Sequence, residues 1–220
     1  IALSYINLLD ADAALELVRE FDQPAASVIK HATPCGCATA PTLADAFDKA
    51  YAGDPVSAFG GIVALNREVD ERTAEHIVSG KRFLEVMIAP AYTPAALELL
   101  KARWKNCRIL QTGSLARRGT QTLSYRSVTG GVLVQQRDSA GFDRATARVA
   151  SARVPSEAEW ADLAFVWLCT KHVKSNAIAV ARDGQLLAAG AGQMSRVTSS
   201  RLAIELARQN GHEPRLRGAA

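Results

Sequence analysis

Lysine and histidine stand side by side at positions 30 and 31, directly after an apolar run at residues 25–29. A neutral imidazole can accept a proton near pH 7, and a neighbouring ammonium favours the neutral form of the ring. The same ammonium can stabilise an oxyanion that forms during group transfer. Lys30 and His31 are therefore candidates for a proton acceptor and a stabilising cation, while an exposed basic pair on a loop remains open at this point.

His31 also stands close to two cysteines, Cys35 and Cys37, which raises the alternative of a zinc site. A zinc deaminase needs H-x-E together with P-C-x-x-C. Here Ala32 and Thr33 follow the histidine, so the general-acid glutamate is missing, and only one residue separates the cysteines. We expect no metal, and we expect the cysteines to be small buried residues that pack a turn at residues 33–36.

Three further segments could contact a ligand. The run Ser-Ala-Phe-Gly-Gly at residues 57–61 lets a ligand approach the backbone, although a structural tight turn explains it equally well. Asn176 follows Lys-Ser and could orient a substrate, or it could close a helix. Arg196 ends a glycine-bearing loop and could clamp a phosphate or carboxylate, or it could be a surface residue. Neither a P-loop nor a G-x-G-x-x-G motif is present.

Short apolar strands that alternate with amphipathic helices must position these residues, which predicts a layered α/β fold with helices covering a mostly parallel sheet. Asp10 or Asp12 is expected to cap the first helix, and Ser156 with Glu159 forms a capping box for the clearest helix. A hairpin or two sheet strands are predicted at residues 123–136, and a hairpin around the Asp-Gly pair at 183–184, with a polar, basic loop at 113–121. Residues 139–155 lack an apolar period, so we place a domain boundary or a long crossover there.

Composition limits the class of protein. The chain has 220 residues, 48% of them hydrophobic, and a net charge of +4 from 26 basic and 22 acidic side chains. This mild excess suits an anionic small molecule and falls short of the clustered charge that nucleic acid binding requires. Apolar runs stay well below the roughly 18 residues of a membrane helix, and no secretory signal is apparent. We expect a cytoplasmic protein with reduced thiols that binds neither nucleic acid nor membrane.

The candidate segments occur in an order that resembles one family. The matching motifs are Leu3-Ser4-Tyr5, Lys30-His31-x-x-Pro34-x-Gly36, Ser57-Ala58-Phe59-Gly60-Gly61, Ile88-Ala89-Pro90, Gly130-Gly131-x-Leu133-Val134-Gln135, Lys174-Ser175-Asn176-Ala177 and Gly190-Ala191-Gly192-Gln193-Met194-Ser195-Arg196. Together they resemble the transformylase region of the bifunctional AICAR transformylase/IMP cyclohydrolase family of purine biosynthesis. The resemblance covers essentially the whole chain.

The resemblance implies an enzyme, a formyltransferase. It implies transfer of the formyl group of 10-formyltetrahydrofolate, a co-substrate, to the 5-amino group of AICAR, which gives FAICAR without a metal. It also implies two cytidine-deaminase-like α/β units, the second one incomplete here, and a homodimer with active sites at the interface. Residues 1–150 would form the first unit and residues 151–220 the start of the second.

Residue roles carry over only where this sequence matches the family's motifs. The resemblance implies His31 as the proton acceptor, Lys30 as the residue that stabilises the transition state, and Asn176 as the residue that orients the reacting groups. Positions for nucleotide binding would be Gly60, Glu85 and Arg196. Val197 aligns with a contact to the folate.

Some parts of the family pattern have no counterpart in this sequence. The N-terminal cyclohydrolase domain is absent, as are an upstream Arg-Tyr pair that holds the nucleotide and a downstream segment that contributes a phenylalanine to the folate site. We therefore expect the stretch to lack part of its active site and the family chemistry to belong to a longer protein. The alternative function is that of a non-catalytic module that binds a purine nucleotide.

Overall fold

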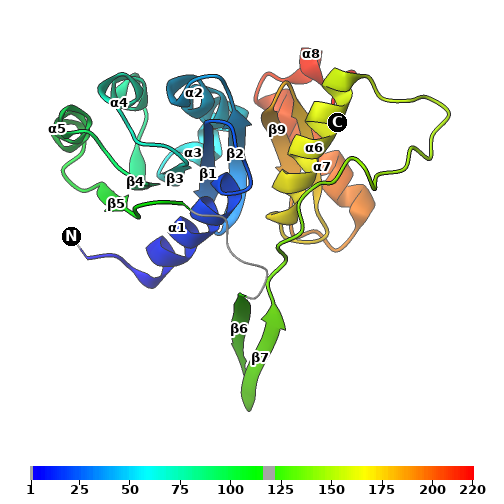
Figure 1. The fold of residues 1–220 in the computed structure, drawn as a ribbon, viewed down its shortest axis with the longest axis horizontal. Helices are drawn as coiled ribbons and strands as arrows, with labels where there is room; N and C mark the ends of the chain where they lie inside the picture. Colours follow the sequence, from blue (N-terminus) through cyan, green and yellow to red (C-terminus); the bar gives the residue numbers. More distant parts are fainter. Residues whose placement is uncertain (1, 116–121) are drawn as a thin grey trace.

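A computed structural model describes residues 2–115 and 122–220 of the chain, so the predicted loop at 113–121 lies mostly outside the described residues. Within the described residues, no helix is both long and apolar enough to cross a membrane. The helices and strands follow one another as α1 (Tyr5–Val18), β1 (Ala25–Lys30), β2 (Thr33–Thr39), α2 (Leu43–Gly53), α3 (Pro55–Ala58), β3 (Gly61–Leu65), α4 (Glu71–Val78), β4 (Leu84–Ala89), α5 (Pro94–Arg103), β5 (Arg108–Gln111), β6 (Leu123–Val128), β7 (Gly131–Gln136), α6 (Glu157–Lys171), β8 (Ile178–Arg182), β9 (Gln185–Gly190), α7 (Arg196–Gln209) and α8 (Glu213–Leu216) (Figure 1).

Seven strands form one mixed sheet in the order β5-β4-β3-β1-β2-β9-β8. The prediction of a mostly parallel sheet is wrong, because only the pairs β3–β4 and β4–β5 are parallel. The pairs β1–β2, β1–β3, β2–β9 and β8–β9 are antiparallel. Two-residue turns connect β1 to β2 and β8 to β9, and such turns can only produce antiparallel pairs, whereas α4 and α5 supply the crossovers that parallel strands need.

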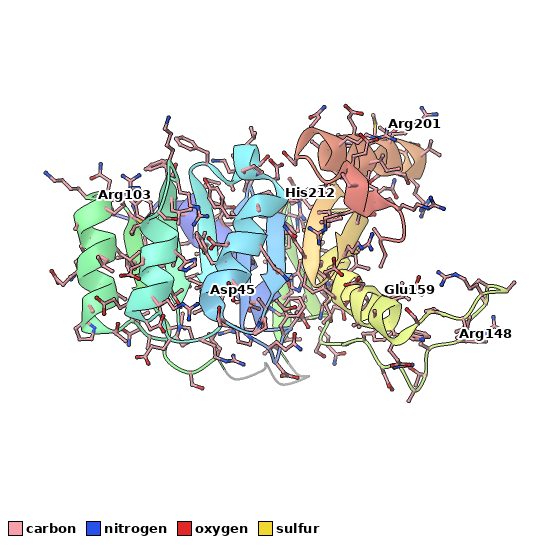
Figure 2. All side chains as sticks on the ribbon, turned by 90° about the horizontal axis from the view of Figure 1, so that it is seen from above. Asp45, Arg103, Arg148, Glu159, Arg201 and His212 are labelled. Carbon is pink, nitrogen blue, oxygen red and sulfur yellow. The ribbon has the colours of Figure 1, made fainter. Side chains whose placement is uncertain are left out.

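Helices cover both faces of the sheet, which confirms the layered α/β/α class. One face packs against α2, α4 and α5, which lie side by side in Figure 1, through a core that includes Phe47, Leu65 and Ile77. The other face packs against α1 and α6 through Leu17 and Phe165, among others. Burial of each large apolar side chain contributes roughly 1.5–3 kcal/mol to folding. Helices α6 and α7 lie on opposite faces of the β8–β9 pair (Figure 2).

The helix starts follow from side-chain caps. As predicted, the Ser156 hydroxyl accepts from the backbone N–H of Glu159, and the Glu159 carboxylate accepts from the N–H of Ser156. The prediction that Asp10 or Asp12 caps the first helix is wrong. Ser4 caps α1 in a reciprocal box with Asn7, so Asp10 lies within the helix. Ser4 Oγ accepts from the Asn7 N–H and Asn7 Oδ1 accepts from the Ser4 N–H, so asparagine at the third position replaces the glutamate that is usual in a capping box.

Two segments extend away from the body of the fold. The predicted hairpin at residues 123–136 is confirmed as β6 and β7, which pair only with each other and project outward in Figure 1. Residues 137–156 contain neither helix nor strand, and Figure 2 shows Arg148 on this segment at the opposite end of the molecule from Arg103. Strands from both sides of residue 150 nevertheless share the seven-stranded sheet.

Candidate active site

The strand directions bring the four candidate segments to one edge of the sheet, which is the side where β1 and β9 end and where β2, β3 and β8 begin. These segments are residues 30–31, 57–61, 174–176 and 190–196. Strand β1 ends at Lys30 where the antiparallel strand β3 begins, since Ile29 pairs with Ile62. Strand β9 runs antiparallel to β2, so its end lies at the same edge as the start of β2. Ile178, at the start of β8, pairs with Gly190 at the end of β9. The connections that carry the candidate residues are therefore neighbours in space although they are distant in sequence.

The half-buried Lys30 side chain is held against the start of β3. Its Nζ donates to the carbonyl oxygens of Phe59 at 3.0 Å and Gly60 at 3.1 Å. Gly60 has a φ of +69°, and a Cβ at this position would lie 3.3 Å from the same Nζ, so glycine permits this close approach. An ammonium has three donors, and two of them serve these carbonyls. Lys30 and Gly60 are thus brought together.

His31 lies in the two-residue turn between β1 and β2, and its side chain is exposed. His31 and Ala32 have φ values of +53° and +56°, and a left-handed conformation costs a non-glycine residue roughly 1–2 kcal/mol. Two contacts hold this turn. The Asp10 carboxylate accepts from the Ala32 backbone N–H at 2.6 Å, and Lys174 Nζ donates to the His31 carbonyl oxygen at 3.2 Å. His31 is thereby joined to the segment that carries Asn176.

The turn predicted at residues 33–36 is wrong, because these residues begin β2. Gly36 serves packing here: a Cβ at this position would lie 1.9 Å from the Ala50 carbonyl oxygen, so the glycine allows α2 to pack directly on the strand. Cys35 donates from its Sγ to the Val28 carbonyl at 3.4 Å, and burial raises the pKa of its thiol to about 12. Cys37 is fully buried. Within residues 2–115 and 122–220, no group of three or more His, Cys, Asp or Glu side chains could hold a metal ion.

Asn176 lies in the loop between α6 and β8, beyond the end of α6 at Lys171, so it does not close that helix. Its side-chain Nδ2 donates to the Met194 carbonyl at 3.1 Å, and its backbone N–H donates to Gln193 at 3.0 Å. The Ser199 hydroxyl donates to the Asn176 carbonyl at 3.1 Å. These bonds tie Asn176 to the glycine-bearing loop that leads into α7.

Arg196 and Val197 form the first turn of α7, which begins earlier than the sequence predicted, with Ser195 as its N-cap. Both side chains are exposed, and no described residue pairs with the Arg196 guanidinium. The positive end of the helix dipole lies beside this guanidinium. The arrangement therefore presents a cation to an anionic group at the edge of the sheet.

Glu85 lies on β4, near the Gly60 turn. The Phe83 carbonyl two residues earlier accepts from the Gly60 N–H at 2.8 Å, and the half-buried Glu85 carboxylate accepts from the Asn7 side chain at 3.4 Å. The site thus receives two polar residues from α1, Asn7 and Asp10, that sequence reasoning missed. Their signal was present in the pattern, since a polar residue on the buried face of an otherwise apolar helix needs a partner.

A cavity of about 970 Å³ among the described residues lies elsewhere. It opens at the opposite edge of the sheet between α1, α6 and the start of β9, and its wall includes the stacked rings of Phe21 and Phe165. None of the candidate site residues lines it. We place the site at the edge where the polar segments converge, because cavity size alone identifies no chemistry.

Comparison with known proteins agrees with the motifs. The chain matches the family described as AICARFT/IMPCHase bienzyme over residues 1–206. It is 50% identical over 205 residues to the bifunctional purine biosynthesis protein PurH of Anoxybacillus flavithermus, and 49% identical over 205 residues to the protein of the same name from Bacillus subtilis. Each match covers 93% of this chain and 39% of the relative's length. This chain therefore belongs to the AICARFT/IMPCHase bienzyme family.

Proposed function

We propose that this chain carries the formyl-transfer site of a purine-biosynthesis enzyme, which moves the formyl group of 10-formyltetrahydrofolate to the 5-amino group of AICAR. The observation that supports this proposal best is the convergence at one sheet edge. Lys30 contacts Gly60, and His31 is tied through Lys174 to the segment of Asn176. A base, a cation and an orienting amide are the groups that such a transfer needs.

The chemistry follows from the acceptor. The aminoimidazole nitrogen is a poor nucleophile, because its lone pair is delocalised into the ring and the carboxamide. The exposed His31 imidazole takes a proton from this nitrogen as the new C–N bond forms. The formyl oxygen becomes an oxyanion, which the Lys30 ammonium and the Asn176 amide stabilise. The C–N bond to folate then breaks, and the folate nitrogen takes a proton from Lys30 or water.

Substrate binding uses the remaining residues. The Gly60 turn and Glu85 contact the nucleotide, and Arg196 pairs with an anionic group of a substrate, supported by its exposure at the start of α7. Val197, which is 60% exposed, packs against the folate. Two substrates held face to face also gain an orientation advantage, which reaches roughly 7–11 kcal/mol in the best cases.

We propose further that the protein is a cytoplasmic homodimer with active sites at the interface, with residues 1–150 as one unit and 151–220 as the start of a second. Exposed apolar side chains on one face of the β6–β7 hairpin support an interface. Leu123, Tyr125, Val132 and Val134 are 43%, 67%, 58% and 54% exposed. An isolated two-stranded hairpin is marginally stable in water, so a covered face would stabilise it.

The test uses this sequence within a protein of its relatives' full length, because the chain spans 39% of that length. Formation of FAICAR is measured for the wild type, for His31→Ala and for Lys30→Ala. We expect each substitution to lower kcat by about 10²–10⁴-fold, while AICAR binding weakens moderately at most. Arg208→Ala is the control, because Arg208 is exposed at the C-terminal end of α7, opposite the first turn that carries Arg196. Wild-type turnover in both site variants would reject the proposal.

The alternative, a non-catalytic module that binds a purine nucleotide, is favoured by the share of the relatives that this chain covers. Calorimetry on the 220-residue chain distinguishes the two functions. The module is supported if AICAR binds to the chain, if this binding requires Arg196, and if the longer protein shows neither folate binding nor turnover. Turnover in the longer protein that requires His31 would support the transferase.

A further inference from the structure

The turn that presents His31 has an unusual composition for its geometry. Two-residue turns with both central residues at positive φ normally contain asparagine, aspartate or glycine, which tolerate that conformation. This turn contains His31 and Ala32 instead, at +53° and +56°. Alanine has no side-chain group that could stabilise the left-handed region, so the conformation of Ala32 depends on contacts from outside the turn.

Asp10 supplies one such contact from the interior of α1. Its side chain is 3% exposed, and Oδ1 accepts the Ala32 backbone N–H at 2.6 Å. Aspartate is an unfavourable residue within a helix, because its side chain competes for backbone hydrogen bonds. The cap of α1 is Ser4, so helix capping does not account for Asp10. The hydrogen bond to the Ala32 N–H accounts for an aspartate at this position.

The His31 imidazole depends on this backbone for its position. Lys174 fixes the carbonyl side of His31, and Asp10 fixes the N–H of the next residue. Among the described residues, none forms a hydrogen bond with the imidazole itself. The two bonds that hold the turn therefore fix the backbone from which the His31 ring projects.

We propose that Asp10 is a positioning residue for His31, acting through the Ala32 N–H. The proposal rests on the proposed function for its effect on catalysis, and on the geometry of the turn for its effect on the ring. A misplacement of about 1 Å can reduce turnover by about 10²-fold. Loss of the Asp10 carboxylate should therefore lower kcat and leave substrate affinity nearly unchanged.

The chain contains a matched control at the opposite edge of the sheet. The turn between β8 and β9 also has two residues at positive φ, Asp183 at +54° and Gly184 at +65°. The Asp162 carboxylate accepts from the backbone N–H groups of both, each at 3.0 Å. Asp162→Ala thus removes the same kind of support from the same kind of turn, away from the candidate site.

The first arm of the test observes the ring without any assay of activity. Histidine side-chain resonances of the 220-residue chain are recorded by NMR, and the His31 signal is assigned with His31→Gln. We expect Asp10→Ala to shift and broaden the His31 signal, and Asp10→Asn, which keeps an acceptor oxygen, to leave it near its wild-type position. Asp162→Ala should not move it. An unmoved His31 signal in a folded Asp10→Ala chain overturns the proposal.

The second arm measures kcat, KM and Tm in the full-length protein. We expect Asp10→Ala to lower kcat by about 10²-fold with less than about a twofold change in KM. Asp10→Asn should stay within about fivefold of wild-type kcat, which keeps the test decisive if Asp10→Ala fails to fold. Equal kcat losses in Asp10→Ala and Asp162→Ala at equal Tm losses would show a purely structural role and overturn the proposal. Absence of formyl transfer in the wild type would reject the proposed function, and the NMR arm would still decide the role of Asp10.

Discussion

Lys174 Nζ donates a hydrogen bond to the His31 carbonyl oxygen over 3.2 Å, which joins two motifs that are 143 residues apart. The bond crosses from the loop after α6 to the turn between β1 and β2. It fixes one side of the residue that we propose as the base, and it brings the segment of Asn176 to the same edge of the sheet.

The first prediction concerns this bond. Lys174→Met removes the donor and keeps the length of the side chain, so we expect a loss of kcat of roughly tenfold through a looser His31 turn. The free energy of unfolding should fall by less than about 1 kcal/mol, because the lysine is exposed. Steady-state kinetics and thermal melts of the full-length protein measure both quantities. Lys174→Arg, which keeps a donor, serves as the control, and equal kcat values for all three proteins would contradict the prediction.

A second prediction concerns the packing of α2. Gly36→Ala places a Cβ 1.9 Å from the Ala50 carbonyl oxygen, which forces β2 and α2 apart. Overpacking of this kind costs typically 1–3 kcal/mol, so we expect a Tm many degrees lower or an unfolded chain. Gly131→Ala is the control, because a Cβ there meets nothing within 4 Å. Equal denaturant midpoints for the two variants would show that α2 does not pack on Gly36.

A third prediction concerns stability at acid pH. Burial raises the pKa of Glu20, but hydrogen bonds and charge from His172 and Lys171 outweigh it, and the net pKa is lowered. A carboxyl with a lowered pKa in the folded state stabilises the fold above its unfolded pKa, about 4.3, and loses that contribution as pH falls through the folded value. We expect Glu20→Gln to be less stable than wild type at pH 7, with a difference that shrinks below about pH 4.

Urea unfolding at several pH values from 7 to 3 measures this difference. Glu98→Gln provides the comparison, because its ion pair with Lys101 spans 4.0 Å between exposed side chains. A difference between wild type and Glu20→Gln that is constant over the whole pH range would contradict the prediction.

A fourth prediction concerns thiol reactivity. Burial raises the pKa of Cys35 to about 12 and that of Cys107 to about 11, and Cys37 and Cys169 are fully buried. Because the thiolate is the reactive form, we expect all four cysteines to react with iodoacetamide far more slowly in the native chain at pH 8 than in urea. Mass spectrometry after timed labelling follows each site. Rapid native labelling of Cys35 would show that β2 does not shield it.

The sequence predicted the parts of the site whose signals are local. Lys30, Gly60 and Asn176 each follow or precede a recognisable strand or helix, so their place at an element's end could be inferred. The capping box of Ser156 and Glu159 was equally visible, because both partners lie within four residues. The hairpin at residues 123–136 followed from its central glycines and flanking β-formers.

The remaining features depend on distant contacts that leave no local pattern. The antiparallel place of β9 beside β2 rests on pairing of Ala38 with Gln185. The role of Asp10 depends on a backbone N–H 22 residues away. The sequence predicted a turn at Gly36, whereas the structure shows that this glycine makes room for α2. The sequence alone does not distinguish a glycine needed for close packing from a glycine needed in a turn.

The pairing of β9 with β2 also sets the order in which the molecule can assemble. A ribosome releases β1 to β5 well before β9, so most of the sheet can form while its last two strands are still being made. Contacts of such long sequence separation form slowly, because loop closure must come first. Asn176 and Arg196 reach the edge that carries Lys30 only when β8 and β9 dock, so the proposed site is assembled later than the part of the sheet that contains β1 to β5.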